Sequence, residues 1–372
     1  MIRDVILNQL VFMKKTVPFF KTNFNNNEVR AFTRLVMNGN FSMGKATIDF
    51  EKAIAKKLKI THENVALVSS CTTGLHLSMI VAGVKNKQEV LCSSLTFVAD
   101  ANCIKYVGAK PKFVDITSDL NWNVSVNDLK KKITKRSKAI IMTHYAGYPC
   151  EIAKIKKIAK KNKLVLIEDA CHTIFSKFKK KYLGTYGDLG VFSLYGNKNI
   201  TTGEGGIIIG RKQFIKKVKI LRNHAIDKSM LERDLSKTPT YQINELGYNY
   251  RIDDIRSSIG MEQLKKIDYL NNLRRKLAIN YKKLINKEIP KIKIPFTNFI
   301  GNKFSYHLFP VLLPNNVSRD NLIKFLNTKG IQTSIHYKPI HKLKFYEKKN
   351  FKLRELDKIS NFILSLPNIS RT

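Results

Sequence analysis

Acidic residues are scarce in this chain of 372 residues: 28 Asp and Glu stand against 67 Lys and Arg, which gives a net charge of +39. A charge of this size invites a nucleic-acid interpretation. The lysines, however, spread over the whole chain and fall on helix-like stretches such as residues 130–135 and 154–163, without a basic-aromatic module. We therefore expect no nucleic-acid partner. The charge fits a solvated surface that can also attract an anionic substrate.

Cysteines and long apolar runs are also few. The five cysteines are odd in number and form no Cys-x-x-Cys pair, which argues against a disulfide framework and against a zinc site. We expect buried thiols in a reducing cytoplasm and no bound metal. The longest apolar runs are far shorter than the ~18 residues that a transmembrane helix needs, so we expect no membrane partner.

Short apolar runs alternate with amphipathic stretches between about residues 60 and 210. The expected strands are residues 65–68, 89–92, 112–115, 139–143, 164–168, 190–194 and 206–209, and the expected helices are residues 73–84, 99–107, 126–133 and 151–161. Runs of Val, Ile and Leu without polar alternation are typical of strands covered on both faces. The alternation predicts an α/β fold with a mostly parallel central sheet and helices on both faces. In such sheets, ligands bind beyond the carboxyl ends of the strands.

The pattern changes after residue 211. Residues 212–222 and 253–286 predict long amphipathic helices, and the second of these spans the join between two domains. Shorter segments follow: residues 303–313 and 332–336 are strand-like and residues 318–329 are helical. We therefore predict a large α/β domain with an N-terminal arm at residues 1–265, and a small α+β C-terminal domain at residues 266–372.

Lys198 and Asp169 are the residues whose settings suggest chemistry. Lys198 follows an apolar, strand-like run and precedes Thr and Gly residues. A Lys at the end of a buried strand can form a Schiff base with an aldehyde cofactor, although a lone Lys is more often a solvated surface residue. Asp169 also ends an apolar run. Its carboxylate can bind a protonated pyridine nitrogen through a charge-assisted hydrogen bond, or it can simply cap the next helix.

Other segments can complete a cofactor site. Residues 69–74, Ser-Ser-Cys-Thr-Thr-Gly, join an expected strand to an expected helix. Amides at a helix N-terminus can bind an anion, whereas helix capping by Ser or Thr is the plainer alternative. Phe97 can stack on a planar ring or belong to the core, His172 can contact a phenolic oxygen, and Ser193 can bind a phosphate.

Eight short motifs follow one another along the chain, and their combination and order are specific for one protein family, although each motif alone is a weak signal. They lie at residues 38–44, 70–77, 108–115, 144–147, 168–172, 192–206, 245–251 and 336–341. Together they resemble the sugar-aminotransferase family called DegT/DnrJ/EryC1/StrS, which belongs to the type I fold of pyridoxal 5′-phosphate (PLP) enzymes, the aspartate aminotransferase-like transferases. This family usually continues beyond a Leu-Pro segment like that at residues 366–367, so we expect a small domain that is short at its end.

The resemblance implies a role for each matching residue. Lys198 is implied as the Schiff-base lysine and proton carrier, and Asp169 as the partner of the pyridine nitrogen. The other implied cofactor contacts are Phe97, His172, Cys71 (through its amide), Thr72, Ser193, and Asn249 from the neighbouring subunit of a homodimer with shared active sites. The implied substrate contacts are Arg222, His224, His336, Tyr337 and His341. Ala225 stands where the family usually has Gly.

The resemblance also implies a reaction. A nucleotide-linked 4-keto-6-deoxy sugar receives an amino group from L-glutamate, which gives a 4-amino-4,6-dideoxy sugar for surface-polysaccharide or glycan synthesis. Residues 195–198 resemble perosamine synthases, which act on a GDP-sugar, whereas residues 245–251 resemble relatives that act on UDP-sugars, so the nucleotide stays open among GDP, UDP and dTDP. A nucleotide-sugar 3-aminotransferase and a non-enzymatic PLP-binding regulatory relative are the alternatives.

Overall fold

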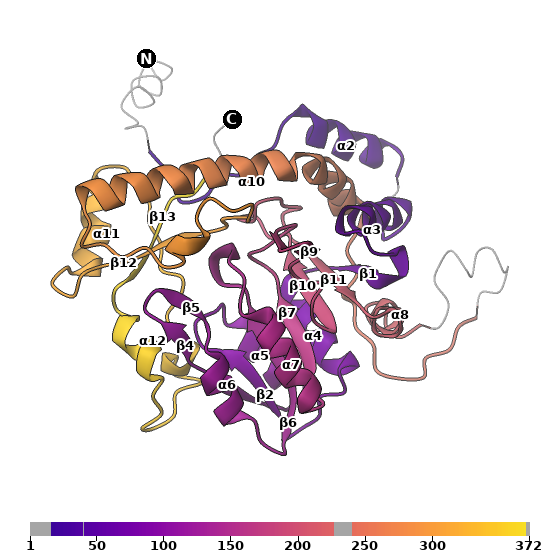
Figure 1. Cartoon of the computed structure of the whole chain (residues 1–372). Coiled ribbons are helices and arrows are strands. Elements are labelled where there is room, and N and C mark those ends of the chain that lie inside the picture. Colours follow the sequence, from indigo (N-terminus) through magenta and orange to yellow (C-terminus); the bar gives the residue numbers. More distant parts are fainter. Residues whose placement is uncertain (1–15, 40, 227–239, 370–372) are drawn as a thin grey trace, which may run out of the picture.

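A seven-stranded sheet forms the centre of the computed structural model, which describes residues 16–39, 41–226 and 240–369 (Figure 1). Its strand order is β1-β11-β10-β7-β6-β2-β3. The bounds are β1 Val65–Val68, β2 Glu89–Ser93, β3 Lys110–Val114, β6 Ser137–Thr143, β7 Val165–Asp169, β10 Leu189–Ser193 and β11 Gly206–Gly210. β11 is antiparallel to both of its neighbours, and the other pairs are parallel. The predicted mostly parallel sheet is confirmed; the reversal at β11 was not predicted.

Helices cover both faces of this sheet because successive side chains of a strand point to opposite faces. Ile207 and Ile209 of β11 belong to the core cluster that includes side chains of α3 and α10, whereas Ile208 belongs to the cluster that includes side chains of α4, α5 and α8. Leu91 and Ile140 pack with α6 and α7. The bounds are α3 Lys45–Leu58, α4 Cys71–Val81, α5 Ala99–Tyr106, α6 Val126–Lys132, α7 Ile152–Lys161, α8 Lys212–Leu221 and α10 Asp254–Glu288.

The C-terminal part is tied to the rest of the chain by α10. This 35-residue helix runs along one side of the molecule, from the region of α11 and β12 to α2 and α3 (Figure 1). The predicted domain boundary at residue 265 therefore falls inside one continuous helix. The remaining helices and paired strands are α2 Asn26–Met37, α11 Arg319–Thr328, α12 Arg354–Ile359, β4 Ile116–Ser118, β5 Asn121–Val124, β8 Lys177–Phe178, β9 Lys181–Tyr182, β12 Phe309–Leu312 and β13 Ile363–Leu366. In the described part of the chain, the short 3-10 helices are η1 His62–Asn64, η2 Tyr145–Gly147, η3 Thr297–Phe299 and η4 Ile340–Lys342.

One strand prediction is wrong. Residues 332–336 form no strand, because the segment pairs with β13 at a single bridge between Ser334 and Ser365. Among the described residues, no helix has both the length and the apolar character that a membrane crossing requires.

The carboxyl ends of several strands meet at one edge of the sheet. β1 and β10 are both antiparallel to β11, so β1 runs in the same direction as β10, β7, β6 and β2. The segments that follow Val68, Ser93, Asp169 and Ser193 therefore lie at the same edge, where ligands bind in sheets of this kind.

Candidate active site

A cavity of about 480 Å³ lies at this edge, within the size range of small-molecule sites. It brings together eight of the residues predicted from the sequence. They are Cys71, Thr72, Phe97, Asp169, Ser193, Lys198, His336 and Tyr337. It also contains Glu204, Tyr195 and Asn197, to which the sequence had assigned no role.

The N-terminus of α4 forms one wall of the cavity. Ser70 caps this helix: its Oγ accepts a hydrogen bond from the Thr73 amide at 3.2 Å, and Thr73 Oγ1 accepts one from the Ser70 amide at 3.1 Å. The amides of Cys71 and Thr72 lie in the first turn, where N–H groups have no acceptor within the helix. Capping and anion binding are therefore compatible here. Burial, with the Asp169 charge, raises the pKa of the Cys71 thiol well above its ordinary value, so no thiolate repels an anion at this helix end.

Asp169 ends β7 and lies beside Thr143 of β6. Its Oδ1 accepts a hydrogen bond from the Cys171 amide at 2.9 Å, and its Oδ2 accepts one from Cys171 Sγ at 3.3 Å. Residues 170–176 form turns and no helix. The alternative that Asp169 caps the next helix is therefore wrong, and its carboxylate faces the cavity.

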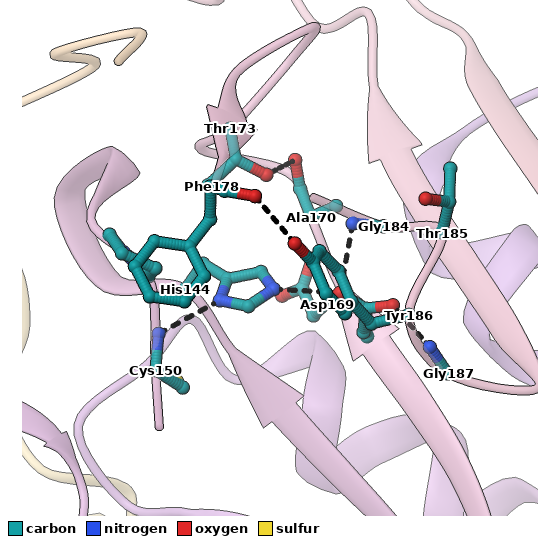
Figure 2. Close-up of polar contacts among 12 residues, drawn as sticks. His144, Cys150, Asp169, Ala170, Thr173, Phe178, Gly184, Thr185, Tyr186 and Gly187 are labelled. Carbon is teal, nitrogen blue, oxygen red and sulfur yellow. Dashed lines mark hydrogen bonds and ion pairs between the residues drawn. The ribbon is translucent and has the colours of Figure 1, made fainter. Parts of the chain in front are cut away.

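The neighbouring Glu168 anchors the strand end from the opposite side. Figure 2 shows His144 bonded to the Cys150 amide, with the amides of Gly184 and Gly187 directed at the β7 end. His144 Nδ1 accepts from that amide at 3.1 Å, so Nε2 donates to Glu168 Oε2 at 2.9 Å. The Gly184 and Gly187 amides donate to the same carboxylate at 2.9 and 2.5 Å. Both side chains of this pair are fully buried, and it fixes the strand end that carries Asp169.

Three histidines surround Lys198. Lys198 Nζ lies 3.3 Å from His307 Nε2, and the His307 ring lies 4.5 Å from that of His172. Burial, with the charge of Lys198, lowers the pKa of His172 and of His307 well below normal, and lowers that of His336 to about 4. These rings are therefore neutral at physiological pH.

Aromatic side chains lie at the mouth of the cavity. Phe97 is 56% exposed and its ring lies 6.0 Å from that of Tyr337. Phe97 is therefore not a core residue, which was the plainer alternative. The Tyr337 hydroxyl lies 3.0 Å from His172 Nε2. Ser193, at the end of β10, accepts a hydrogen bond from the Tyr195 amide at 3.3 Å.

Two predicted substrate contacts lie elsewhere. Arg222 is buried and its Nη1 donates to Glu51 Oε1 at 2.7 Å. His341 is also buried, and its ring lies between Ser94 Oγ at 2.7 Å and Asp357 Oδ1 at 3.1 Å. Neither lines the cavity, and these contacts favour structural roles, since their polar groups are already bonded.

His224 and Asn249 are exposed and lie outside the cavity lining of the single chain. His224 and Ala225 have φ angles of 59° and 57°. This left-handed region favours glycine, which fits the Gly that the family usually has at 225. Asn249 pairs with Asn223 at a single bridge, and its role toward a neighbouring subunit stays a prediction.

The residues of the cavity fit the cofactor that the resemblance implies. The amine of Lys198 suits the aldehyde of PLP, and the carboxylate of Asp169 suits its pyridine nitrogen. The N-terminus of α4 suits the phosphate, and the exposed ring of Phe97 suits the face of the pyridine ring. Asn197 Oδ1 and His172 Nδ1 are buried polar atoms without a hydrogen-bond partner among the described residues, which is expected of a polar site that receives a ligand. Within the same residues, no group of three His, Cys, Asp or Glu side chains is placed to hold a metal ion.

Comparison with known proteins agrees with the geometry. Residues 22–372 match the DegT/DnrJ/EryC1/StrS aminotransferase family. The chain is 34% identical to a GDP-perosamine synthase of Escherichia coli O157:H7 over 83% of this chain and 80% of that protein. It is 32% identical to a UDP-4-amino-4,6-dideoxy-N-acetyl-beta-L-altrosamine transaminase of Campylobacter jejuni over 94% and 92%. The crystal structure of the aminotransferase TlmJ from Streptoalloteichus hindustanus matches with a TM-score of 0.89 at 27% identity, over 95% and 94% of the two chains.

Proposed function

The chain belongs to the DegT/DnrJ/EryC1/StrS aminotransferase family of PLP-dependent sugar aminotransferases, and from this premise we propose that it aminates a nucleotide-linked 4-keto-6-deoxy sugar. The amino donor is L-glutamate, and the product is a 4-amino-4,6-dideoxy sugar for a surface polysaccharide or another glycan. The observation that carries the proposal is the meeting of Lys198, Asp169 and the α4 N-terminus in one cavity. The name of the Campylobacter relative, which contains a 4-amino-4,6-dideoxy sugar, supports amination at C4.

Residues in and beside the cavity would hold the cofactor. The amides of Cys71 and Thr72, with Ser193, would bind its phosphate, since a helix N-terminus attracts anions. Asp169 would accept a hydrogen bond from the protonated pyridine nitrogen, Phe97 would cover the ring, and His172, which lies beside the cavity rather than in its lining, would contact the phenolic oxygen. When bound, PLP supplies the carbonyl that takes up the amine and the ring that accepts the electron pair.

Lys198 is the acid and base of the reaction. With PLP present, its Nζ would hold the cofactor through the carbonyl carbon. As a free amine, Nζ would take up a proton from glutamate and later deliver a proton to the sugar carbon that receives the nitrogen. His336 and Tyr337, which line the cavity beside Lys198, orient the sugar.

Replacing Lys198 with Ala tests the assignment. The variant is expected to lose the near-visible absorbance of the lysine-bound cofactor and all turnover, while the substitution of the exposed Lys180 with Ala changes neither. The substrate is identified by incubating the enzyme with PLP, glutamate and GDP-, UDP- or dTDP-linked 4-keto-6-deoxy sugars, followed by mass spectrometry of the product. NMR of that product distinguishes C4 from C3 amination. Full activity in Lys198→Ala, or no amination of any 4-keto sugar, contradicts the proposal.

We further propose a cytoplasmic homodimer with shared active sites, in which Asn249 reaches the partner's cofactor phosphate. Apolar side chains that are exposed on the single chain support association; they include Phe24, Phe32, Met37, Phe41 and Leu246. The five free cysteines agree with a reducing compartment. Mixing inactive Lys198→Ala and Asn249→Ala subunits tests the shared site, because each hybrid dimer regains one intact site. Hybrid dimers that form without any recovery of activity argue against it.

A further inference from the structure

His307 reaches the active-site lysine from the C-terminal part of the chain. It lies 109 positions after Lys198, just before β12, and only 6% of it is exposed. Its Nε2 lies 3.3 Å from Lys198 Nζ. Nothing in the sequence had singled it out, because only the folded chain brings these two residues together.

Neighbouring hydrogen bonds fix which nitrogen of His307 carries the proton. Asn199 Nδ2 donates to the Ser305 carbonyl at 2.7 Å and to Asn271 Oδ1 at 2.7 Å. A carbonyl oxygen can only accept, so the amide orientation of Asn199 is set and its Oδ1 faces His307 Nδ1 at 3.1 Å. That contact requires a proton on Nδ1. Burial, with the charge of Lys198, keeps the ring neutral by lowering its pKa, so Nε2 has a free lone pair directed at Lys198.

We propose that His307 is a positioning residue, which accepts a hydrogen bond from Lys198 Nζ whenever that nitrogen is not bonded to the cofactor. The proposal rests on the assignment of Lys198 above. It applies to the cofactor-free protein and to every stage of transamination at which Lys198 acts as a free acid or base. A hydrogen bond to the charged form of a group favours that form, so His307 favours the ammonium form of Lys198 over the nucleophilic amine.

Other titratable groups face the two side chains. Asp169, Glu204, Cys71 and Cys171 line the same cavity as Lys198. Around His307, burial lowers its pKa most, followed by Lys198, then His172, Arg274 and His336. Arg274 Nη1 also donates to the His307 carbonyl at 3.4 Å. Substitutions at His307 leave all these groups in place, so a difference in pH profile between variants that keep and that lose the Nε2 acceptor reports on that acceptor.

Three variants separate the acceptor from the rest of the ring. His307→Gln can place its side-chain oxygen near the position of Nε2 and so keeps an acceptor for Lys198. His307→Asn can keep the hydrogen bond to Asn199, yet its shorter side chain does not reach Lys198. His307→Leu removes both interactions. If His307→Leu impairs folding, the comparison of His307→Gln with His307→Asn still tests whether the acceptor at Nε2 is needed.

The test measures Schiff-base formation at Lys198 as a function of pH. Full-length protein is freed of cofactor and mixed with PLP, the absorbance change gives the rate, and borohydride trapping with peptide mass spectrometry identifies the lysine. His307→Asn and His307→Leu are expected to react roughly 10-fold faster near neutral pH, with the profile moved to lower pH, because the ammonium form loses a charge-assisted hydrogen bond. His307→Gln is expected to keep the wild-type profile.

The outcomes separate the two proposals. Identical pH profiles in the wild type and in all three variants overturn the role of His307 while leaving Lys198 as the reactive lysine. A pH profile that moves equally in His307→Gln and His307→Asn also overturns the role of His307, because a change in packing alone then explains the effect. Trapping at another lysine in the wild type overturns the proposed function itself.

Discussion

Replacing Arg222 with Met removes the cation from a buried ion pair. The side chains of Arg222 and Glu51 are 6% and 2% exposed, and Arg222 Nη1 also donates to the Leu67 carbonyl of β1. Burial opposes the ionisation of Glu51, but Arg222, with His62 and Lys219, outweighs burial and holds the pKa of this carboxyl well below normal. The pair therefore joins α3, β1 and the end of α8.

The expected loss of stability is large. Removing one partner of a buried ion pair costs about 3–5 kcal/mol, because the other charge is left without compensation. We expect a loss of stability at the lower end of this range, about 3 kcal/mol. The reason is that Glu51 retains its ion pair with Lys219 Nζ at 2.8 Å and its hydrogen bond from the Leu67 amide at 2.9 Å. The double variant Glu51→Gln with Arg222→Met is expected to be more stable than Arg222→Met alone, because no unpaired carboxylate remains in the interior.

Urea unfolding of the cofactor-free protein measures these differences by linear extrapolation. The sign of the pH dependence follows from Glu51: a carboxyl whose pKa is depressed in the folded state stabilises the fold above its unfolded pKa of about 4.3. The difference in free energy of unfolding between the wild type and Arg222→Met should therefore become smaller as the pH falls below about 4. An unchanged free energy of unfolding together with a raised KM for the sugar would refute the structural role and restore Arg222 as a substrate contact.

Two further predictions concern Asp100 and Gly206, which lie next to residues of the cavity lining. Burial and the nearby Asp169 charge raise the pKa of the buried Asp100 carboxyl, so the stability that this group confers is lost as the pH rises from about 4. Thermal melts should therefore show a pH-dependent loss of melting temperature in the wild type that Asp100→Asn lacks. Parallel plots of melting temperature against pH for the two proteins would contradict this. Gly206→Ala places a Cβ 2.5 Å from the Ser70 carbonyl oxygen, which should cost about 1–3 kcal/mol and weaken PLP binding in an absorbance titration. Gly196→Ala, with its nearest contact at 4.0 Å, is the control, and equal PLP affinities in the two variants would count against the reasoning.

The strands, and the positions of Lys198 and Asp169 at the ends of apolar runs, could be predicted because their signals are local. The run at residues 65–68 coincides with β1 Val65–Val68, and the runs that end near Asp169 and Ser193 are within one residue of β7 and β10. Buried strands are continuous apolar runs, and Lys198 and Asp169 each follow or end such a run. The contacts of Arg222 and His341 could not be predicted, because their partners Glu51 and Ser94 lie 171 and 247 positions away along the chain.

The sequence by itself determined the α/β class, the mostly parallel sheet and the set of motifs at its carboxyl edge, because these depend on apolar periodicity and on residue types at short spacing. Tertiary structure alone decided that β11 is reversed, that Phe97 is exposed and that His307 lies against Lys198. Each of these depends on which distant segments pack together, and burial and hydrogen-bond partners are properties of that packing rather than of any local stretch of chain.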